Sequence, residues 1–267
     1  MNTNKFALVT GGTHGIGLEL AKLLAADHYN LVIVARNKQE LDEVSKALSD
    51  LHPIEVITIE KDLSDRDAPH QVVEALQAKG IVLDILVNNA GQGVYGEFVD
   101  TELDRELAIV QLNINACVIL TKYALKEMVA RNSGKILNVS SIAGKVPGPY
   151  QAVYHGTKAF VHFFSEAIRN EIKETGVTVT SLLPGATDTD FFNKADMEES
   201  KIVQEGDLAD PADVAKDGYN ALMEGKDKVI SGFKNKVKIA MSNMMPDSLA
   251  TDNMGKQQEP VTKGQNN

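Results

Sequence analysis

The chain has 267 residues, 43% of them hydrophobic, which is enough for one large α/β domain with a full core. Its net charge of −10, with no basic stripe along the sequence, argues against nucleic-acid binding. The single cysteine, Cys117, rules out an intramolecular disulfide and fits a reducing compartment.

Strand-like and helix-like segments alternate along most of the chain. The predicted strands are the apolar runs 6–9, 31–35, 54–59, 81–87, 135–139 and 177–183. The predicted helices between them cover 18–26, 37–51, 68–79, 103–130 and 154–175. Apolar strands without alternation, separated by helices, indicate a parallel sheet covered on both faces. We therefore expect a Rossmann-type, doubly wound α/β fold with three layers, in a single domain over residues 1–250.

The C-terminal third has a different composition. Residues 190–212 are acidic and irregular, and a loop of this length is often a lid. Apolar residues between 233 and 244 share helical spacing with lysines between them, which predicts a helix packed on the body or on a partner subunit. A helix lying on a membrane surface is the alternative. Residues 251–267 are polar and lack aromatic side chains, so we expect a poorly ordered tail.

The start of the chain bears on localisation. The first predicted strand begins almost at Met1, which leaves no room for a signal peptide. No apolar run approaches the roughly 18 residues that a membrane-spanning helix needs. We therefore expect a soluble, cytoplasmic protein without an integral membrane segment.

A glycine-rich turn joins the first strand to the first helix, with the sequence Thr10-Gly11-Gly12-Thr13-His14-Gly15-Ile16-Gly17. Glycines allow a tight turn and a close approach to a ligand. The helix start offers free N–H groups and a positive dipole end to a phosphate. The spacing is Thr-Gly-x-x-x-Gly-x-Gly, which differs from the general dinucleotide fingerprint. Alone, such a segment can also be only a turn.

A tyrosine and a lysine, Tyr154 and Lys158, stand one helical turn apart. A cation beside a phenol lowers the tyrosine pKa from about 10, which would allow proton transfer near neutral pH. Ser141, at the end of the fifth strand, could hydrogen-bond a carbonyl oxygen, while alternation turns Ser140 the other way. Asn113 is either a link in a proton relay or a solvated helix position, and the Tyr–Lys pair alone could be a solvated face.

Taken together, these motifs resemble the short-chain dehydrogenase/reductase family over about residues 5–190. The matching segments, in the family's order, are Thr10–Gly17, Asn88-Asn89-Ala90-Gly91, Asn113, Ser141, Tyr154-x-x-x-Lys158 and Pro184-Gly185. The resemblance implies an NAD(P)-dependent oxidoreductase in which Tyr154 is the acid/base. Lys158 would lower the tyrosine pKa and bind the nicotinamide ribose. Ser141 would hold the substrate oxygen, and Asn113 would maintain a water-mediated proton path.

The resemblance also implies a cofactor-binding set and no metal. That set is Gly11, Thr13, His14, Gly15, Ile16, Gly17, Arg36, Asp62, Leu63, Asn89, Ala90, Gly91, Tyr154, Lys158, Pro184, Gly185, Thr187 and Thr189. Asp62 and Leu63 would face the adenine, and either threonine would help Pro184 and Gly185 to hold the carboxamide.

Arg36, at the end of the second strand, bears on the choice of cofactor. An acidic residue there would bind the ribose 2′-hydroxyl of NAD, whereas arginine suits a 2′-phosphate. Thr13, His14 and Lys38 could add donors. We therefore predict NADP(H), although Arg36 could also be only a solvated strand-end cation.

The sequence predicts the substrate less specifically than the cofactor. The expected pocket walls are Val94, Tyr95, Phe98, Pro147–Tyr150 and Phe191-Phe192, with Lys145 as the only nearby base. Mostly apolar walls favour a small apolar ketone or aldehyde, unless these loops pack against each other. Reduction of a 3-oxoacyl thioester and a non-catalytic NADP-binding sensor are the alternative functions.

The end of the chain and two of its helices bear on assembly. Many relatives end in a strand and a glycine-rich stretch that complete a tetramer, whereas here only the short segment 228–232 precedes the lysine-rich helix. The chain thus resembles a poorly characterised bacterial reductase branch. Helices 103–130 and 154–175 carry more apolar residues than one buried face requires, which predicts a homodimer through them, with a homotetramer left open.

Overall fold

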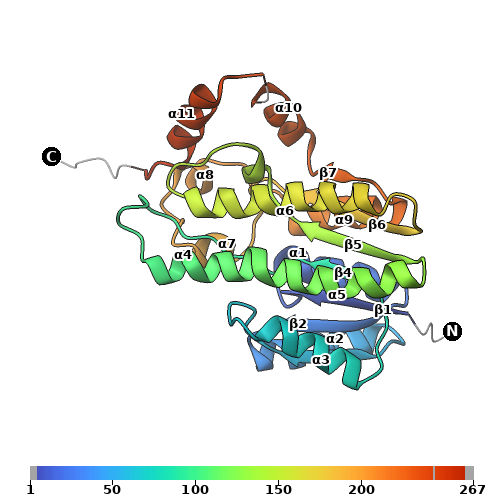
Figure 1. The fold of residues 1–267 in the computed structure, drawn as a ribbon. Helices are drawn as coiled ribbons and strands as arrows, with labels where there is room; N and C mark the ends of the chain where they lie inside the picture. Colours follow the sequence, from blue (N-terminus) through green and yellow to red (C-terminus); the bar gives the residue numbers. More distant parts are fainter. Residues whose placement is uncertain (1–4, 243, 262–267) are drawn as a thin grey trace.

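Seven parallel strands form one sheet at the centre of the structure, a computed structural model that describes residues 5–242 and 244–261 (Figure 1). The strand order is β3-β2-β1-β4-β5-β6-β7. The strands are β1 Phe6–Thr10, β2 Asn30–Ala35, β3 Val56–Glu60, β4 Leu83–Asn88, β5 Gly134–Val139, β6 Val177–Leu183 and β7 Lys228–Ile230. The doubly wound parallel sheet expected from the sequence is confirmed, with β7 as a short seventh strand at its edge.

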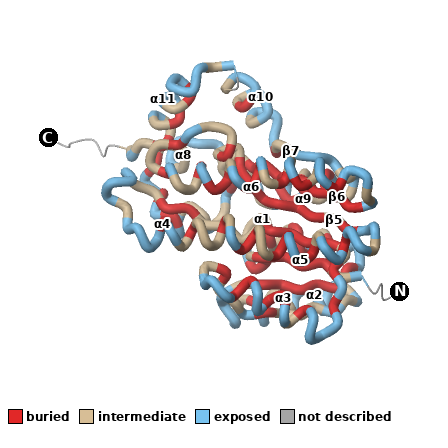
Figure 2. Tube along the Cα trace, in the orientation of Figure 1, coloured by how far each residue is buried: buried red, intermediate tan, exposed pale blue. Residues whose placement is uncertain are grey.

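Helices cover both faces of the sheet and separate two apolar clusters. On one face lie α1 (Gly15–Ala26), α2 (Lys38–Leu51) and α9 (Pro211–Glu224). On the other lie α3 (Ala68–Ala78), α5 (Cys117–Ala130) and α6 (Ala152–Glu171). Figure 2 shows the strands buried between these layers. Because both faces are covered, the strands need continuous apolar sequence, which is the pattern that predicted them.

Local sequence sets several helix ends. Asn37 caps α2, since its side chain accepts from the backbone N–H groups of Gln39 and Glu40. Asp210 caps α9 in the same way, and Gly225 ends that helix in the left-handed conformation, at φ 68°. These short signals fix where the chain leaves each helix and returns to the sheet.

The predicted helix 103–130 is interrupted by a π-helical segment. It consists of α4 (Leu103–Val110), η1 (Gln111–Ala116) and α5. π-Helical turns are rare and often lie at functional sites.

Leu103–Ala130 is also long and apolar enough to cross a membrane, so the expectation that no segment reaches that length was wrong. Length and composition are weak evidence for a span, because core helices of soluble proteins meet the same criterion; here α5 packs on β4 and β5.

The C-terminal third is more ordered than predicted. The lid region contains two short helices, α7 (Phe191–Lys194) and α8 (Lys201–Gln204), and α10 (Phe233–Ser242) and α11 (Asp247–Gln258) follow β7. In Figure 1, α10 and α11 lie at the top of the view, above α6 and α8.

Residues 251–258 therefore contradict the prediction of a poorly ordered tail. Ala250, Met254 and Gln258 are buried at four-residue spacing, which gives α11 an inward face. Backbone hydrogen bonds from Lys201 N to Glu259 O (3.1 Å) and from Val261 N to Glu199 O (2.8 Å) hold the segment that follows. The rest of the predicted tail, residues 262–267, lies outside the described residues.

Candidate active site

A cavity of about 430 Å³ lies at the carboxyl ends of the strands. It brings together nearly all of the residues that the sequence singled out: Gly11, Thr13, His14, Gly15, Ile16, Arg36, Asp62, Leu63, Asn89, Ala90, Gly91, Ser141, Tyr154, Lys158, Pro184, Gly185, Thr187 and Thr189. Gly17 and Asn113 do not line it. Parallel strands place their carboxyl ends at one edge of the sheet, so residues far apart in sequence meet there.

The glycine turn makes one wall of this cavity. Gly11 and Gly15 have φ of 63° and 52°, which side chains rarely allow. A Cβ at Gly15 would lie 2.7 Å from Thr189 Cγ2. The helix α1 begins at Gly15. Its N-cap residue, His14, makes no side-chain hydrogen bond to the N–H groups of the first turn. Such a helix start can accept a phosphate.

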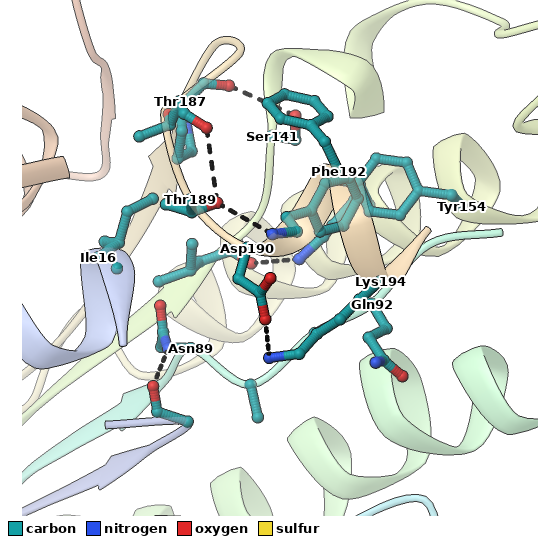
Figure 3. A pocket seen from close by; sticks show the side chains of 18 of the residues that line it. Ile16, Asn89, Gln92, Ser141, Tyr154, Thr187, Thr189, Asp190, Phe192 and Lys194 are labelled. Atoms are coloured by element: carbon teal, nitrogen blue, oxygen red, sulfur yellow. Dashed lines mark hydrogen bonds and ion pairs between the residues drawn. The ribbon is translucent and has the colours of Figure 1, made fainter. Parts of the chain in front are cut away.

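Gly17 acts beneath the turn and not in the cavity wall. A Cβ there would lie 2.2 Å from Gly11 O and 2.3 Å from Asn89 Nδ2. Because Gly17 has no Cβ, the Asn89 side chain can donate to Thr10 O (2.9 Å) and to Gly11 O (3.0 Å), and Figure 3 draws one hydrogen bond of this side chain. Gly17 therefore permits the contact that joins the ends of β1 and β4.

Arg36 lies at the far end of the cavity, directly after β2. Its Nη1 is 3.5 Å from Asp62 Oδ2, and half of the side chain is exposed. His14 Nδ1 is 3.3 Å from Glu40 Oε2, a carboxylate that also lines the cavity and that the sequence reasoning missed. Lys38, predicted as an extra donor, does not line the cavity and pairs with Asp42 at 3.1 Å.

Tyr154 and Lys158 lie one turn apart on α6, with Lys158 Nζ 5.8 Å from the tyrosine ring centroid. Lys158 donates to Val139 O at 2.9 Å. Ser141 Oγ accepts from Ala143 N at 3.1 Å, which holds this hydroxyl at the end of β5. Ser141 Oγ also donates to Pro184 O at the longer distance of 3.4 Å, and Ser140 donates to Lys158 O at 2.7 Å.

Burial dominates the titration of this pair. It raises the pKa of Tyr154 to about 12, although a hydrogen bond with Ser141 lowers it. Burial also lowers the pKa of Lys158 to about 8. Loss of hydration thus opposes the lowering of the tyrosine pKa that the resemblance implies, and the hydrogen bond with Ser141 acts in the other direction.

Asn113 is a buried side chain, 3% exposed, on the π-helical turn, so it is not a solvated helix position. Its amide donates to Gln92 O (2.8 Å) and Thr157 Oγ1 (2.9 Å), and its oxygen accepts from Gln92 N (3.0 Å). A Cβ at Gly91 would lie 3.1 Å from Lys158 Nζ and 3.2 Å from Asn113 Oδ1. Asn113 thus joins the loop after β4 to α6, close to the Lys158 ammonium.

The opposite end of the cavity differs from the predicted substrate pocket. Of the expected walls, only Phe191 and Phe192 line it; Val94, Tyr95, Phe98, Pro147–Tyr150 and Lys145 do not. Tyr95 turns its hydroxyl to Gln258 O, and Phe98 is 62% exposed. The residues present in their place come from the lid and three helices: Gln151, His155, Lys194, Met197, Lys238, Met254 and Gln258. Figure 3 shows Lys194 paired with Asp190 (2.7 Å) in this region.

A cluster of buried amides lies beside Tyr154. His155 Nδ1 lies 2.8 Å from Val146 O, so we assign the ring proton to Nδ1. Gln258 Nε2 can then donate to His155 Nε2 (3.0 Å) and to Gln151 Oε1 (3.3 Å). Gln258 comes from α11, more than 100 residues away in sequence, and no local pattern signals this contact.

The short chain dehydrogenase family pattern matches residues 5–200, the part of the chain that contains the glycine turn, Ser141, Tyr154 and Lys158. The chain belongs to the short chain dehydrogenase family. Very-long-chain 3-oxoacyl-CoA reductase-A of Danio rerio is 37% identical to this chain over 184 residues, which are 67% of the chain. The match spans only 57% of that relative's length.

Two further relatives cover more of their own length. An uncharacterized oxidoreductase of Staphylococcus epidermidis is 31% identical over 206 residues, covering 77% of this chain and 88% of the relative. A short-chain dehydrogenase from Sphingobium yanoikuyae, solved in complex with NADPH, superposes with a TM-score of 0.80 at 26% identity. That alignment covers 90% of this chain and 94% of the other.

Proposed function

We propose that this protein is an NADPH-dependent carbonyl reductase, or in the reverse direction an alcohol dehydrogenase. The observation that carries the proposal is the meeting of Ser141, Tyr154 and Lys158 with the glycine turn in one cavity. A hydroxyl, a phenol and an ammonium beside a phosphate-binding turn suit the transfer of a hydride and a proton to a carbonyl group.

NADP(H) fits the residues present. The turn at Gly11 and Gly15 leaves room for phosphates against the start of α1, and Arg36 offers a guanidinium to a ribose 2′-phosphate. The Sphingobium dehydrogenase, with NADPH in its structure, supports the same choice. When bound, the cofactor supplies the hydride. The side chains of the protein hold the substrate and supply the proton.

The protein's part is to hold the substrate oxygen and supply a proton. Tyr154 is protonated at neutral pH, because burial raises its pKa to about 12, so it can donate to the oxygen of a carbonyl under reduction. Ser141 holds the same oxygen through its hydroxyl. Lys158 binds the nicotinamide ribose, and Asn113 fixes the loop through which a proton path from Lys158 would run.

Reduction of a 3-oxoacyl thioester is the second candidate. It is favoured by the similarity to the Danio rerio 3-oxoacyl-CoA reductase, of which this chain matches 57%. A sensor that binds NADP without turnover is a third reading, and the presence of both Tyr154 and Lys158 argues against it.

We also propose that the protein is a cytoplasmic homodimer, with a tetramer left open. Tyr123 on α5 and Phe160 and Phe163 on α6 are 41%, 41% and 63% exposed, an apolar face that a second copy would cover. The buried free thiol of Cys117 accords with a reducing compartment.

A panel of ketones, aldehydes and 3-oxoacyl thioesters, followed by the absorbance of NADPH, tests the function. We expect oxidation of NADPH with at least one carbonyl class and a slower reaction with NADH. Tight NADPH binding without turnover of any member would instead support the sensor.

A further inference from the structure

Lys238, on α10, lines the substrate end of the cavity and, like Lys61 and Lys158 in the same cavity, forms no ion pair with a carboxylate of the described residues. Its side chain is partly buried in the cavity wall, and burial lowers its pKa. Lys194, Lys201 and Lys234 each pair with a carboxylate. In the described part of the chain, no carboxylate lies within ion-pair distance of Lys238, and its hydrogen-bond partner is the neutral amide oxygen of Gln257. A partly buried ammonium without a counter-charge is costly unless an anion joins it.

Lys238 is shared by two hollows. A groove of about 600 Å³ adjoins the catalytic cavity, and the residues common to both are Ile142, Ala186, Ile202 and Lys238. Further along, the groove has apolar walls at Leu208 and Phe233 and basic side chains at Lys234 and Lys256. Two carboxylates, Glu205 and Asp207, also line it, and Asp207 is paired with Lys234.

The position of α10 is fixed against the nicotinamide end of the cavity. A Cβ at Gly185 would lie 2.4 Å from Asn235 Nδ2, so the start of α10 packs directly on the loop after β6. Asn235 also donates to Ser231 O at 2.7 Å. Lys238 follows one turn later, whereas the phosphate-binding turn and Arg36 belong to β1 and β2. Lys238 is therefore better placed for a substrate than for the cofactor phosphates.

We propose that the substrate carries an anionic group, joined to its reactive carbonyl by an apolar chain, and that Lys238 binds this group. The inference rests on the proposed carbonyl reductase activity. The carbonyl would lie at Tyr154, the chain along Ile142 and Ile202, and the anion at Lys238. The anion is a carboxylate, as in a keto acid, or a phosphate, as in a phosphopantetheine thioester. The small apolar substrate expected from the sequence is replaced by a longer, amphipathic one.

Matched substrates separate charge from shape. Keto acids of increasing length are compared with their methyl esters, and 3-oxoacyl phosphopantetheine thioesters with the corresponding pantetheine thioesters, which lack only the phosphate. We expect kcat/KM to favour the anionic member of one pair by about 10- to 100-fold, the range of a hydrogen bond to a charged partner. The preferred pair distinguishes a carboxylate from a phosphate, and the preferred length reports the span from Tyr154 to Lys238.

Three variants assign that preference to Lys238. In Lys238→Met the ratio of kcat/KM between the anionic and neutral members should fall towards one. Lys238→Arg should retain most of it. Lys236→Met, an exposed lysine on the same helix that lines neither hollow, is the matched control and should keep the wild-type ratio. Calorimetry of NADPH binding to all three variants provides a readout independent of turnover.

Two results would overturn the proposal. One is a wild-type protein that treats the charged and neutral members alike. The other is a Lys238→Met variant that loses NADPH affinity by the same factor as activity, which would place Lys238 at the cofactor. If no carbonyl compound is reduced, the proposed function itself fails. Binding of the keto acids and thioesters to NADP-loaded Tyr154→Phe protein, with and without the additional Lys238→Met change and measured by calorimetry, then still decides whether Lys238 selects anions.

Discussion

The two ends of the cavity are built in different ways. The cofactor end is made by strand termini and the turns that follow them, such as Gly11 after β1 and Arg36 after β2. The substrate end is made by side chains from α6, the lid and two C-terminal helices, among them Gln151, Lys238 and Gln258. The first end is thus positioned by the sheet, whereas the second depends on packing between distant segments. Substitutions at the first end should therefore change nucleotide affinity, and substitutions at the second should change substrate KM. The predictions below test that division.

The largest effect is expected at the boundary of the two ends, from Tyr154→Phe. The substitution removes the proposed proton donor and keeps the ring, so turnover should fall by about 10²- to 10⁴-fold while NADPH affinity is retained. Steady-state kinetics and calorimetry measure the two quantities. Turnover at the wild-type rate would show that another group supplies the proton.

Arg36→Asp should act on the cofactor end alone. The carboxylate repels a 2′-phosphate and accepts from a ribose hydroxyl, so the preference between NADPH and NADH should reverse, with a change of about 10- to 100-fold in their ratio. Calorimetry with both nucleotides measures this, and the choice among carbonyl substrates should stay the same. Equal or tighter NADH binding by the unmodified protein would contradict the assignment of Arg36.

The pH dependence of carbonyl reduction should report Lys158. Burial lowers its pKa to about 8, so the ammonium form predominates below that pH and is lost above it, while Tyr154 remains protonated. The value of kcat/KM should therefore decline by about tenfold per unit as pH rises beyond this point. Lys158→Arg keeps its charge and should move the decline to higher pH. A decline at the same pH in both proteins would exclude Lys158 as its source.

Gln258→Leu should affect the substrate end and the attachment of α11. The change leaves His155 and Gln151 without their amide partner, which should destabilise the protein by about 1–3 kcal/mol in urea unfolding and raise the substrate KM. NADPH affinity should not change. Asp252→Ala, on the exposed side of the same helix, is the control and should leave both values near wild type.

The smallest effect on catalysis is expected from breaking the predicted dimer, because its face lies outside the cavity. The double substitution of Phe160 and Phe163 by Glu should reduce the mass in light scattering from twice 28.9 kDa to 28.9 kDa. Phe233→Glu, at a phenylalanine that is even more exposed but lies on α10, should remain dimeric. A wild-type protein of 28.9 kDa at micromolar concentration would refute the dimer.

The cofactor end could be predicted from sequence because its signals are local. A glycine-rich turn between an apolar strand and a helix, and a tyrosine four residues before a lysine, carry their geometry in their spacing. The substrate end could not be predicted in this way. Tyr95 and Phe98 follow a strand, as pocket residues often do, yet Tyr95 turns to the backbone of Gln258 and Phe98 to solvent.

The sequence by itself therefore determined the order of strands and helices, the parallel sheet and the residues gathered at the strand ends. Burial on both faces requires continuous apolar strands, and short spacings define turns and helix faces. Only the tertiary structure decided that Gln258 and Lys238 reach the cavity, that α11 is a packed helix, and that burial raises the pKa of Tyr154 above its ordinary value. Each of these depends on desolvation and contacts between segments far apart in the chain, which have no period or motif in the sequence.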